Sequence, residues 1–211
     1  MSEENNQKSY NVKCVVVGDS GTGKTCIAQR LAFNNFTENP ESTIGASNFT
    51  YLFEFGDTSL KLEIWDTAGQ EAYRSLNRIF YKDAKIAILT YDITNNESFK
   101  NISTIWLPQV KECVDQNAIL FICGNKCDKY DEEKVKEEDA KAYADTIGAM
   151  FAQTSALQGI GIKEMFSAAA KKYLSLIGID FKEENNTETV KLDKNKNKKK
   201  KDKKDDKDGC C

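Results

Sequence analysis

Histidine is absent from this chain of 211 residues, and proline occurs only twice. Without histidine the chain cannot form a Ser-His or Cys-His nucleophile pair, nor a zinc or haem site that depends on histidine ligands. It also lacks an apolar run of the roughly 18 residues that are needed to cross a bilayer. The N-terminal sequence MSEENNQKSY is polar and acidic, unlike a secretory signal. We therefore expect a cytosolic chain.

Cysteine is present, but its spacing does not predict disulfides. The chain has seven cysteines, an odd number without the spacing of a disulfide framework. Cys123 and Cys127 are four residues apart, but no second ligand pair follows, so a zinc site is not expected. Cys210 and Cys211 differ from the others because they are the last two residues.

Charge divides the chain into an acidic body and a basic tail. Residues 194–208 contain nine lysines and four aspartates, although the whole chain has a net charge of −3. The region from residue 178 onward is rich in Asn, Lys, Asp and Glu, so it cannot bury enough apolar surface to fold. We predict disordered segments at 1–9 and 178–211 on either side of one domain, residues 10–177.

Between these segments, strand-like and helix-like patterns alternate. Short apolar runs of strand length occupy residues 12–17, 86–91, 119–124 and 150–153, and helix-like stretches occupy 24–33, 97–113, 137–147 and 162–176. Two further strands, 52–55 and 60–64, surround a turn at Gly56 and Asp57. This alternation predicts an α/β domain of three layers, with helices on both faces of a six-stranded, mostly parallel sheet that has one antiparallel edge strand. Ligands of such sheets bind beyond the carboxyl ends of the strands.

A glycine-rich loop follows the first predicted strand. Its sequence GDSGTGKT, residues 18–25, matches the phosphate-binding pattern G-x-x-x-x-G-K-[ST] between a strand and a helix. Backbone N–H groups of such a loop can face a phosphate chain at the positive end of the helix, and here they belong to Ser20, Gly21 and Gly23. Lys24 would reach the β- and γ-phosphates, and the Thr25 hydroxyl would bind Mg²⁺. The alternative is a glycine-rich turn that merely closes a strand, and the flanking strand and helix disfavour it.

The second motif, WDTAGQE at residues 65–71, lies at the end of a strand with clean period-two alternation. Asp66 can hold Mg²⁺ through water, the Gly69 N–H can donate to a γ-phosphate, and Gln70 can orient an attacking water. Alone, this motif would be an acidic strand end followed by a turn. Together with the phosphate-binding loop it predicts hydrolysis, with Gln70 and Lys24 as catalytic residues.

The third motif consists of Asn125, Lys126 and Asp128, directly after an apolar strand. The Asp128 carboxylate can accept two hydrogens from guanine N1 and N2, whereas adenine lacks this donor pair. Such a short pattern occurs by chance, but the order and strand-end position of all three motifs favour function. Backbone donors for the guanine O6 carbonyl would come from Thr154, Ser155 and Ala156.

The motifs GDSGTGKT, STIG, WDTAGQE, YDIT, GNKCD and TSA occur in this order, and together they resemble the Ras-like small GTPases over residues 11–176. YDITNNESF and the final Cys-Cys are similar to the Rab branch, and residues 42–47, GNKCD and DAKAYA are most similar to its early-endosomal members. The resemblance implies a P-loop GTPase domain that binds GTP or GDP with Mg²⁺. By position, it implies that Thr43 binds Mg²⁺ and the γ-phosphate, that Phe36 packs against guanine, and that Cys26 lies beside the α-phosphate.

The same resemblance implies a molecular switch in vesicle and endosomal membrane traffic, with slow GTP hydrolysis. The expected regulators are a guanine nucleotide exchange factor, a GTPase-activating protein, and a GDP-dissociation inhibitor or escort protein. The GTP form would bind effectors through its switch segments, on a surface that includes Trp65 and Phe80. Geranylgeranyl groups on Cys210 and Cys211 would hold a monomer on the cytoplasmic face of endosomal or vesicle membranes, with a cytosolic pool. The lysine run either adds to membrane binding or is a solvated spacer, and a nucleic-acid partner is not expected.

Three positions depart from the pattern of relatives. Asn48 stands where the Rab branch usually has an aromatic residue, and the neighbouring Phe49 would face the other side of its strand. Ala72 replaces a common arginine. Pro108 lies inside a predicted helix, where it should remove one hydrogen bond and kink the helix. The Rho branch has a similarly placed proline, but this chain has no room for the Rho insert helix and ends without a C-a-a-X box.

Three other functions are alternatives: a Rho-like GTPase, a metabolic P-loop kinase or ATPase, and a non-enzymatic scaffold with a basic tail. A metabolic kinase would need several arginines in a lid and a second-substrate site, and this chain has only three arginines. A scaffold would leave the phosphate-binding loop and Gln70 unexplained. Thermal stabilisation by GDP or GTP, compared with stabilisation by ATP, separates a GTPase from a metabolic kinase or ATPase and from a scaffold.

Overall fold

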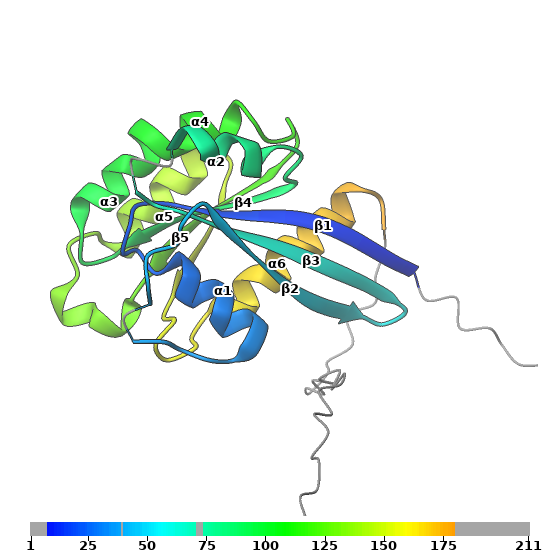
Figure 1. The fold of residues 1–211 in the computed structure, drawn as a ribbon, viewed down its shortest axis with the longest axis horizontal. Coiled ribbons are helices and arrows are strands. Elements are labelled where there is room, and N and C mark those ends of the chain that lie inside the picture. Colours follow the sequence, from blue (N-terminus) through cyan, green and yellow to red (C-terminus); the bar gives the residue numbers. More distant parts are fainter. Residues whose placement is uncertain (1–7, 39, 71–73, 180–211) are drawn as a thin grey trace, which may run out of the picture.

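Figure 1 shows the computed structural model, which describes residues 8–38, 40–70 and 74–179. Ala72, Cys210 and Cys211 lie outside these described residues, as do most of the two predicted disordered segments. The predicted domain start at residue 10 differs from the structure, because Lys8 and Ser9 already pair with Thr58 and Ser59 of a neighbouring strand. The predicted domain end also differs, since Ile179 still packs against the hydrophobic core.

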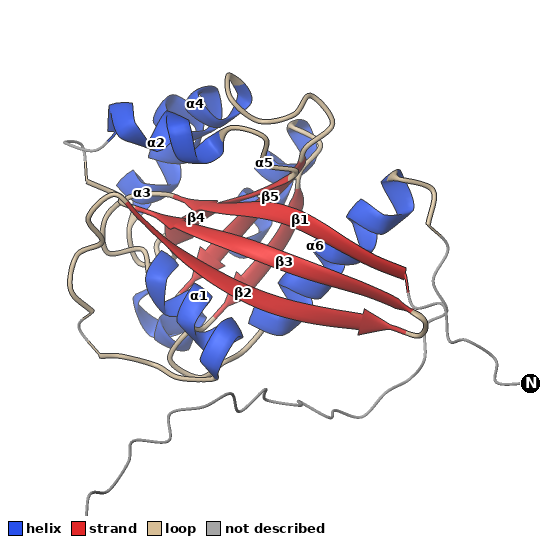
Figure 2. Ribbon diagram, turned by 45° about the vertical axis from the view of Figure 1, so that its right-hand side comes forward, coloured by secondary structure: helices blue, strands red, loops and turns tan. Residues whose placement is uncertain are grey.

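The strands form a six-stranded sheet in the order β2-β3-β1-β4-β5-β6 (Figure 2). They span Lys8–Val17 (β1), Ala46–Phe55 (β2), Thr58–Thr67 (β3), Ile86–Asp92 (β4), Ile119–Asn125 (β5) and Met150–Thr154 (β6). β2 lies at one edge and pairs antiparallel with β3, whereas the other neighbouring strands pair parallel. This arrangement confirms the predicted α/β class and the antiparallel edge strand.

Helices cover both faces of the sheet because successive residues of the buried strands point to opposite sides. Along β1, Cys14 and Val16 belong to the core that also contains side chains of α1 (Lys24–Phe33) and α6 (Ile162–Leu176). Val15 and Val17 belong to a second core on the other face. That second face is covered by α2 (Arg74–Tyr81), α3 (Asn96–Asn101), α4 (Leu107–Lys111) and α5 (Glu137–Thr146). The predicted three layers are therefore confirmed.

The single helix predicted over residues 97–113 is wrong, because three consecutive segments occupy this region. They are α3, the π-turn η2 (Ile102–Trp106) and α4. Within η2 the Leu107 N–H donates to the carbonyl of Ile102, which is the wider i→i+5 pattern. Pro108 lies in the first turn of α4, which continues directly from η2, since Trp106 and Leu107 keep helical φ and ψ. The predicted helix is thus interrupted near Pro108, and the interruption is the widened π-turn η2, which precedes the proline.

Three more features differ from the sequence-based expectation. β2 begins at Ala46, six residues before the predicted strand, and its whole length pairs with β3. The helix α2 and the 3₁₀ helix η3 (Cys127–Glu132) were not predicted. The prediction of free thiols is confirmed for the cysteines that the structure describes: Cys14, Cys26, Cys113, Cys123 and Cys127.

The topology brings the three motifs to the same end of the sheet. β1, β3, β4, β5 and β6 run parallel, so the loops that follow them leave from one edge. The loop after β1 contains the glycine-rich motif, the loop after β3 contains Gly69 and Gln70, and the loop after β5 contains Lys126 and Asp128. The loop after β6 begins with Ser155.

Candidate functional site

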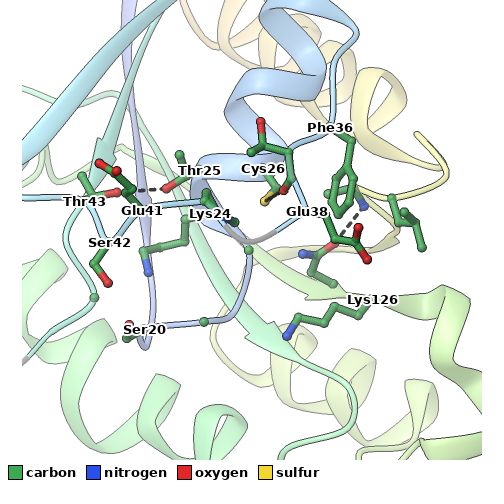
Figure 3. Close-up of a pocket in the computed structure, with 18 of the residues that line it drawn as sticks. Ser20, Lys24, Thr25, Cys26, Phe36, Glu38, Glu41, Ser42, Thr43 and Lys126 are labelled. Atoms are coloured by element: carbon green, nitrogen blue, oxygen red, sulfur yellow. Dashed lines mark hydrogen bonds between the residues drawn. The ribbon is translucent and has the colours of Figure 1, made fainter.

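A cavity of about 560 Å³ opens at this end of the sheet (Figure 3). Most of the residues predicted to bind nucleotide or metal line it: Ser20, Gly21, Gly23, Lys24, Thr25, Cys26, Phe36, Thr43, Gly69, Gln70, Asn125, Lys126, Asp128 and Ala156. The cavity is also lined by residues that were not predicted: Thr37, Glu38, Pro40, Glu41, Ser42, Lys129 and Leu157. Asp66, Thr154 and Ser155 are buried and hydrogen-bond to lining residues. The structure thus brings the predicted residues to one place.

The phosphate-binding loop turns tightly between β1 and α1. The Thr22 hydroxyl donates to the carbonyl oxygen of Asp19 at 2.9 Å and closes the turn. Gly23 has a φ of 93°, and a Cβ there would collide with the side-chain amide of Asn125. Only glycine therefore allows the loop to approach β5 this closely. α1 begins at Lys24 and has its first turn at the cavity wall, so the positive end of the helix dipole borders the cavity.

Lys24 is the buried cation of the site. The residue is 6% exposed, and its Nζ donates to the carbonyl oxygen of Asp19 at 2.7 Å. Burial lowers the pKa of Lys24 to about 8, while the negative charges of Asp66 and Asp19 oppose this shift. An anion in the cavity would favour the charged ammonium further, because an opposite charge nearby raises the pKa of a lysine.

Side-chain oxygen atoms from three segments meet beside Lys24. The Oδ2 atom of Asp66 accepts hydrogen bonds from the hydroxyls of Thr25 at 2.7 Å and Thr43 at 3.2 Å, and these hydroxyls are 3.0 Å apart. Figure 3 shows the Thr25 and Thr43 side chains pointing toward one another. The other oxygen, Oδ1, is buried and has no hydrogen-bond partner among the residues that the structure describes. Burial raises the pKa of Asp66, although Thr25, Lys24 and Thr43 favour its charged form. A buried carboxylate with a spare oxygen is suited to a cation.

The opposite end of the cavity is held by hydrogen bonds between the loops after β5 and β6. The Ser155 hydroxyl donates to Oδ1 of Asp128, and the Ser155 oxygen accepts the N–H of Gln158 at 3.0 Å. These contacts fix the direction of the Asp128 carboxylate. Thr154, Ser155 and Ala156 were predicted to offer backbone donors to the guanine O6. In the structure Ala156 lines the cavity, and the Thr154 and Ser155 side chains hydrogen-bond to Asn125 and Asp128.

Asn125 joins three loops of the site and is only 1% exposed. Its Nδ2 donates to the carbonyl oxygen of Thr22 at 2.8 Å, which ties the phosphate-binding loop to β5. Its Oδ1 accepts the Thr154 hydroxyl and the Ala156 N–H, each at 3.2 Å. A side-chain amide has both donors and acceptors, so one asparagine can satisfy backbone groups of two loops together.

Sequence reasoning missed two residues that support the site. The Asp92 carboxylate forms an ion pair with Lys126 at 2.6 Å and accepts the N–H and the hydroxyl of Thr94. Lys126 and the Thr94 bonds lower the pKa of Asp92 against the opposing effect of its burial. Arg30 of α1 donates to the carbonyl oxygens of Ala156 at 2.9 Å and Leu157 at 2.8 Å. Asp92 belongs to the YDIT motif, so the sequence could have indicated its role at the site. Arg30 belongs to no such motif.

Gly69 and Gln70 bring the loop after β3 against the phosphate-binding loop. A Cβ on Gly69 would come within 2.5 Å of the Asp19 carbonyl carbon, the Ser20 nitrogen and the Lys24 Nζ. A side chain larger than hydrogen would therefore push the two loops apart. Gln70 is exposed and lines the cavity.

The predicted effector surface contains the aromatic pair Trp65 and Phe80, and the third position of this surface, on β2, is Asn48. Trp65 and Phe80 stack with their ring centroids 5.8 Å apart, and the ammonium of Lys13 lies 4.8 Å from the Trp65 ring centre. Asn48 is the β2 partner of Trp65 and is exposed. Phe49 faces the opposite side and packs against the core, with Phe33 at 5.9 Å. The expectation that Phe49 cannot replace the missing aromatic residue is confirmed.

Comparison with known proteins agrees with this geometry. The model of the Ras family matches residues 13–175. The chain belongs to the Ras family. Ras-related protein RABF2b of Arabidopsis thaliana is 40% identical over 165 residues, which are 78% of this chain and 82% of that protein. Ras-related protein Rab5A of Oryza sativa subsp. japonica is 40% identical over 174 residues, covering 82% and 85% of the two chains. Ras-related protein Rab-31 of Homo sapiens is 38% identical over 183 residues, covering 87% and 92%.

The chain is therefore a small GTPase of the Rab branch, which binds guanine nucleotides and hydrolyses GTP. It is similar to the early-endosomal group of that branch, as its motifs predicted, and it regulates endosomal membrane traffic as a switch. The relatives do not favour the Rho-like GTPase or the metabolic kinase that the sequence left as alternatives.

Proposed function

We propose that the cavity holds GTP or GDP, with the phosphates at Lys24 and the guanine base at Asp128. The observation that carries this proposal is the convergence of three loops around one cavity. At one end lie the glycine-rich loop and the N-terminus of α1, which suit phosphates. At the other end lie Phe36, whose ring can cover the base, and the Asp128 carboxylate, which can accept the guanine N1 and N2 hydrogens.

The corner formed by Thr25, Thr43 and Asp66 fits Mg²⁺. This cation prefers oxygen ligands, and the spare Oδ1 of Asp66 leaves one carboxylate oxygen for a water of its shell. Thr25 and Thr43 would bind the cation directly, and Asp66 would hold one of its waters. When bound, Mg²⁺ neutralises charge on the β- and γ-phosphates.

Hydrolysis would depend on positioning and on charge at the phosphate end of the cavity. The ammonium of Lys24 stabilises the negative charge that develops on the phosphates, and the Gln70 amide orients the attacking water. The motifs that form the phosphate end of the cavity contain no arginine. We therefore expect slow hydrolysis by the chain alone, and an acceleration on the order of 10³–10⁵ by an activating protein that supplies an arginine.

The γ-phosphate would control the shape of two segments. Thr43 and Gly69 come from different loops and both reach the phosphate end of the cavity. With GTP bound, contacts of these two residues with the γ-phosphate would hold both segments in order, and hydrolysis would release them. Effectors would recognise the ordered state at the Trp65 and Phe80 surface. Because Asn48 replaces an aromatic residue there, we expect effectors that tolerate a polar group at this position.

The regulators would be an exchange factor, a GTPase-activating protein, and a GDP-dissociation inhibitor or escort protein that handles the lipidated tail. Among the residues that the structure describes, no helix is long and apolar enough to span a bilayer. Membrane attachment would come from geranylgeranyl groups on Cys210 and Cys211, since two lipid chains are needed for stable anchoring. The GTPase would act as a monomer on the cytoplasmic face of endosomal or vesicle membranes and exchange with a cytosolic pool.

Thermal unfolding in the presence of nucleotides tests the assignment of the cavity. GDP or GTP at about 1,000 times its dissociation constant should raise the midpoint by about 10 °C in Mg²⁺ buffer, whereas ATP should have little effect. The variant Asp128→Ala should lose this protection. Asp131→Ala changes the same residue type in the same 3₁₀ helix at an exposed position and should keep it. Equal protection by ATP and GTP would contradict the proposed guanine site.

A further inference from the structure

The carboxylate of Asp19 is held from outside the phosphate-binding loop. Its Oδ1 accepts the indole N–H of Trp106 at 2.7 Å, and its Oδ2 accepts the side-chain amide of Asn101 at 2.8 Å. Asn101 ends α3 and Trp106 ends η2, and the two donors are 82 and 87 residues away in sequence. These two consecutive segments, residues 96–106, are called the α3 region below. Hydrogen bonds to a charged acceptor are the stronger kind, so both carboxylate oxygens are firmly attached to this region.

The π-turn η2 is what allows both donors to reach one carboxylate. Asn101 immediately precedes η2 and Trp106 ends it, so the two donors are five residues apart. In an α-helix, residues i and i+5 lie about 140° apart around the axis, and only one of them could face Asp19. A π-turn closes its hydrogen bond between i and i+5 and brings these residues to nearly the same side. The Leu107 N–H donates to Ile102 in this way.

The main chain of Asp19 belongs to the part of the site where we place the γ-phosphate. Its carbonyl oxygen accepts the Lys24 Nζ at 2.7 Å. The peptide between Asp19 and Ser20 lies directly against Gly69, where a Cβ would come within 2.5 Å. A shift of Asp19 would therefore move the ammonium of Lys24 and the loop that contains Gln70 together.

The phosphate-binding loop thus has two separate attachments. The Asp19 side chain attaches its beginning to the α3 region, and the Thr22 carbonyl attaches its later part to Asn125 at 2.8 Å. The first attachment supports the contacts with Lys24 and Gly69, whereas the second supports the loops that would hold the base. Loss of the first should disturb the phosphate end of the site and leave the base end in place.

We propose that Asn101 and Trp106 are positioning residues for GTP hydrolysis, and that the π-turn braces Asp19 for this purpose. This inference rests on the proposed nucleotide site. Through the Asp19 carboxylate, the brace keeps Lys24 and the Gly69–Gln70 loop in register with the γ-phosphate. The brace should matter more for hydrolysis than for GDP retention. Hydrolysis needs Gly69 and Gln70 at the γ-phosphate, whereas GDP lacks this phosphate and is also held by the loops at the base end.

The test compares single-turnover GTP hydrolysis with GDP dissociation in the full chain. Asn101→Asp replaces a donor by a second carboxylate about 3 Å from Asp19, and like charges at this distance repel. We expect hydrolysis to slow by about tenfold, since small displacements of positioned groups have large effects on rate. GDP dissociation should change by a smaller factor, about twofold, because the Asn125 attachment still holds the base end, although Lys24 also reaches the β-phosphate of GDP. Ser103→Ala removes an exposed hydroxyl of the same π-turn and should leave both rates unchanged.

A second variant separates positioning from folding. Trp106→Phe removes the indole N–H from a fully buried side chain, so it can also lower stability. Combined with Asn101→Asp, it should slow hydrolysis by less than the product of the single effects, because both act through one carboxylate. A fall in the unfolding midpoint of Asn101→Asp, together with GDP release that accelerates by at least the factor by which hydrolysis slows, would mean a merely structural role. Unchanged hydrolysis in that variant would overturn the brace. Failure of GDP to protect the unaltered chain would instead refute the proposed site.

Discussion

The substitution Asn125→Ala is expected to weaken guanine nucleotide binding by about two orders of magnitude. The side chain makes three hydrogen bonds, to the Thr22 carbonyl, the Thr154 hydroxyl and the Ala156 N–H, at 2.8, 3.2 and 3.2 Å. Each net contribution is about 1 kcal/mol, so their loss destabilises the arrangement of these loops by about 3 kcal/mol, and a nucleotide that binds only this arrangement must restore it at that cost. Because 1.4 kcal/mol is a factor of ten in an equilibrium constant, this energy corresponds to about 100-fold.

The loss should appear mainly as faster GDP release, since most differences in affinity among variants of one site lie in the dissociation rate. The assay is dissociation of a fluorescent GDP analogue, chased with excess GDP in Mg²⁺ buffer. Thr154→Val keeps the shape of Thr154 but removes one of the three bonds, so it should increase the rate by about fivefold. Asn117→Ala makes the same change as Asn125→Ala at an exposed position and serves as the control.

Two results would refute this reasoning. If Asn125→Ala released GDP at the rate of the unaltered chain, its bonds to the three loops would not determine nucleotide retention. If Thr154→Val had as large an effect as Asn125→Ala, the contributions would not follow the number of hydrogen bonds lost. A change in the unfolding midpoint alone, with unchanged release, would assign Asn125 to the stability of the fold.

Three further predictions concern hydrolysis, pH and membrane attachment. Gln70→Leu should nearly abolish hydrolysis stimulated by an activating protein while GDP binding survives, and unchanged stimulated turnover would contradict the role of Gln70. Burial lowers the pKa of Lys24 to about 8, and phosphates should raise it again, so GDP binding should take up a proton and weaken as the pH rises above about 8. Calorimetry in buffers of different ionisation enthalpy measures this uptake, and an affinity constant from about pH 7 to 9.5 would exclude it. Replacing Cys210 and Cys211 by serine should make the protein wholly soluble in cell fractionation, and persistent membrane association would argue against lipid attachment.

The elements that the sequence predicted most accurately have strong local signals. α1 and α6 begin and end at the predicted residues, and each is preceded by a glycine with positive φ, Gly23 and Gly161. The buried strands β4 and β5 are continuous apolar runs, and each extends only one residue beyond its prediction. Such patterns depend on residues close together in the chain, so they can be recognised without a structure.

The elements that were missed depend on contacts with distant parts of the chain. The first half of β2 alternates between exposed and half-buried residues at the sheet edge, so its apolar signal is weak until pairing with β3 is known. The π-turn η2 has no local signature, and its purpose is visible only where Trp106 and Asn101 meet Asp19. The side-chain contacts of Thr154 with Asn125 and of Ser155 with Asp128 were not predicted, because strand order alone does not show which side chains support one another.

By itself, the sequence determined the chemistry of this protein: the types of residue that can hold phosphates, orient water and select guanine, and the order of strands that carries them. These properties follow from short motifs and from the alternation of apolar residues, which are local. Tertiary structure alone decided how the motif residues support one another, through Asn125 between three loops and Asp19 against the π-turn. Those contacts join residues up to 103 positions apart, and only the packed sheet brings them within hydrogen-bonding distance.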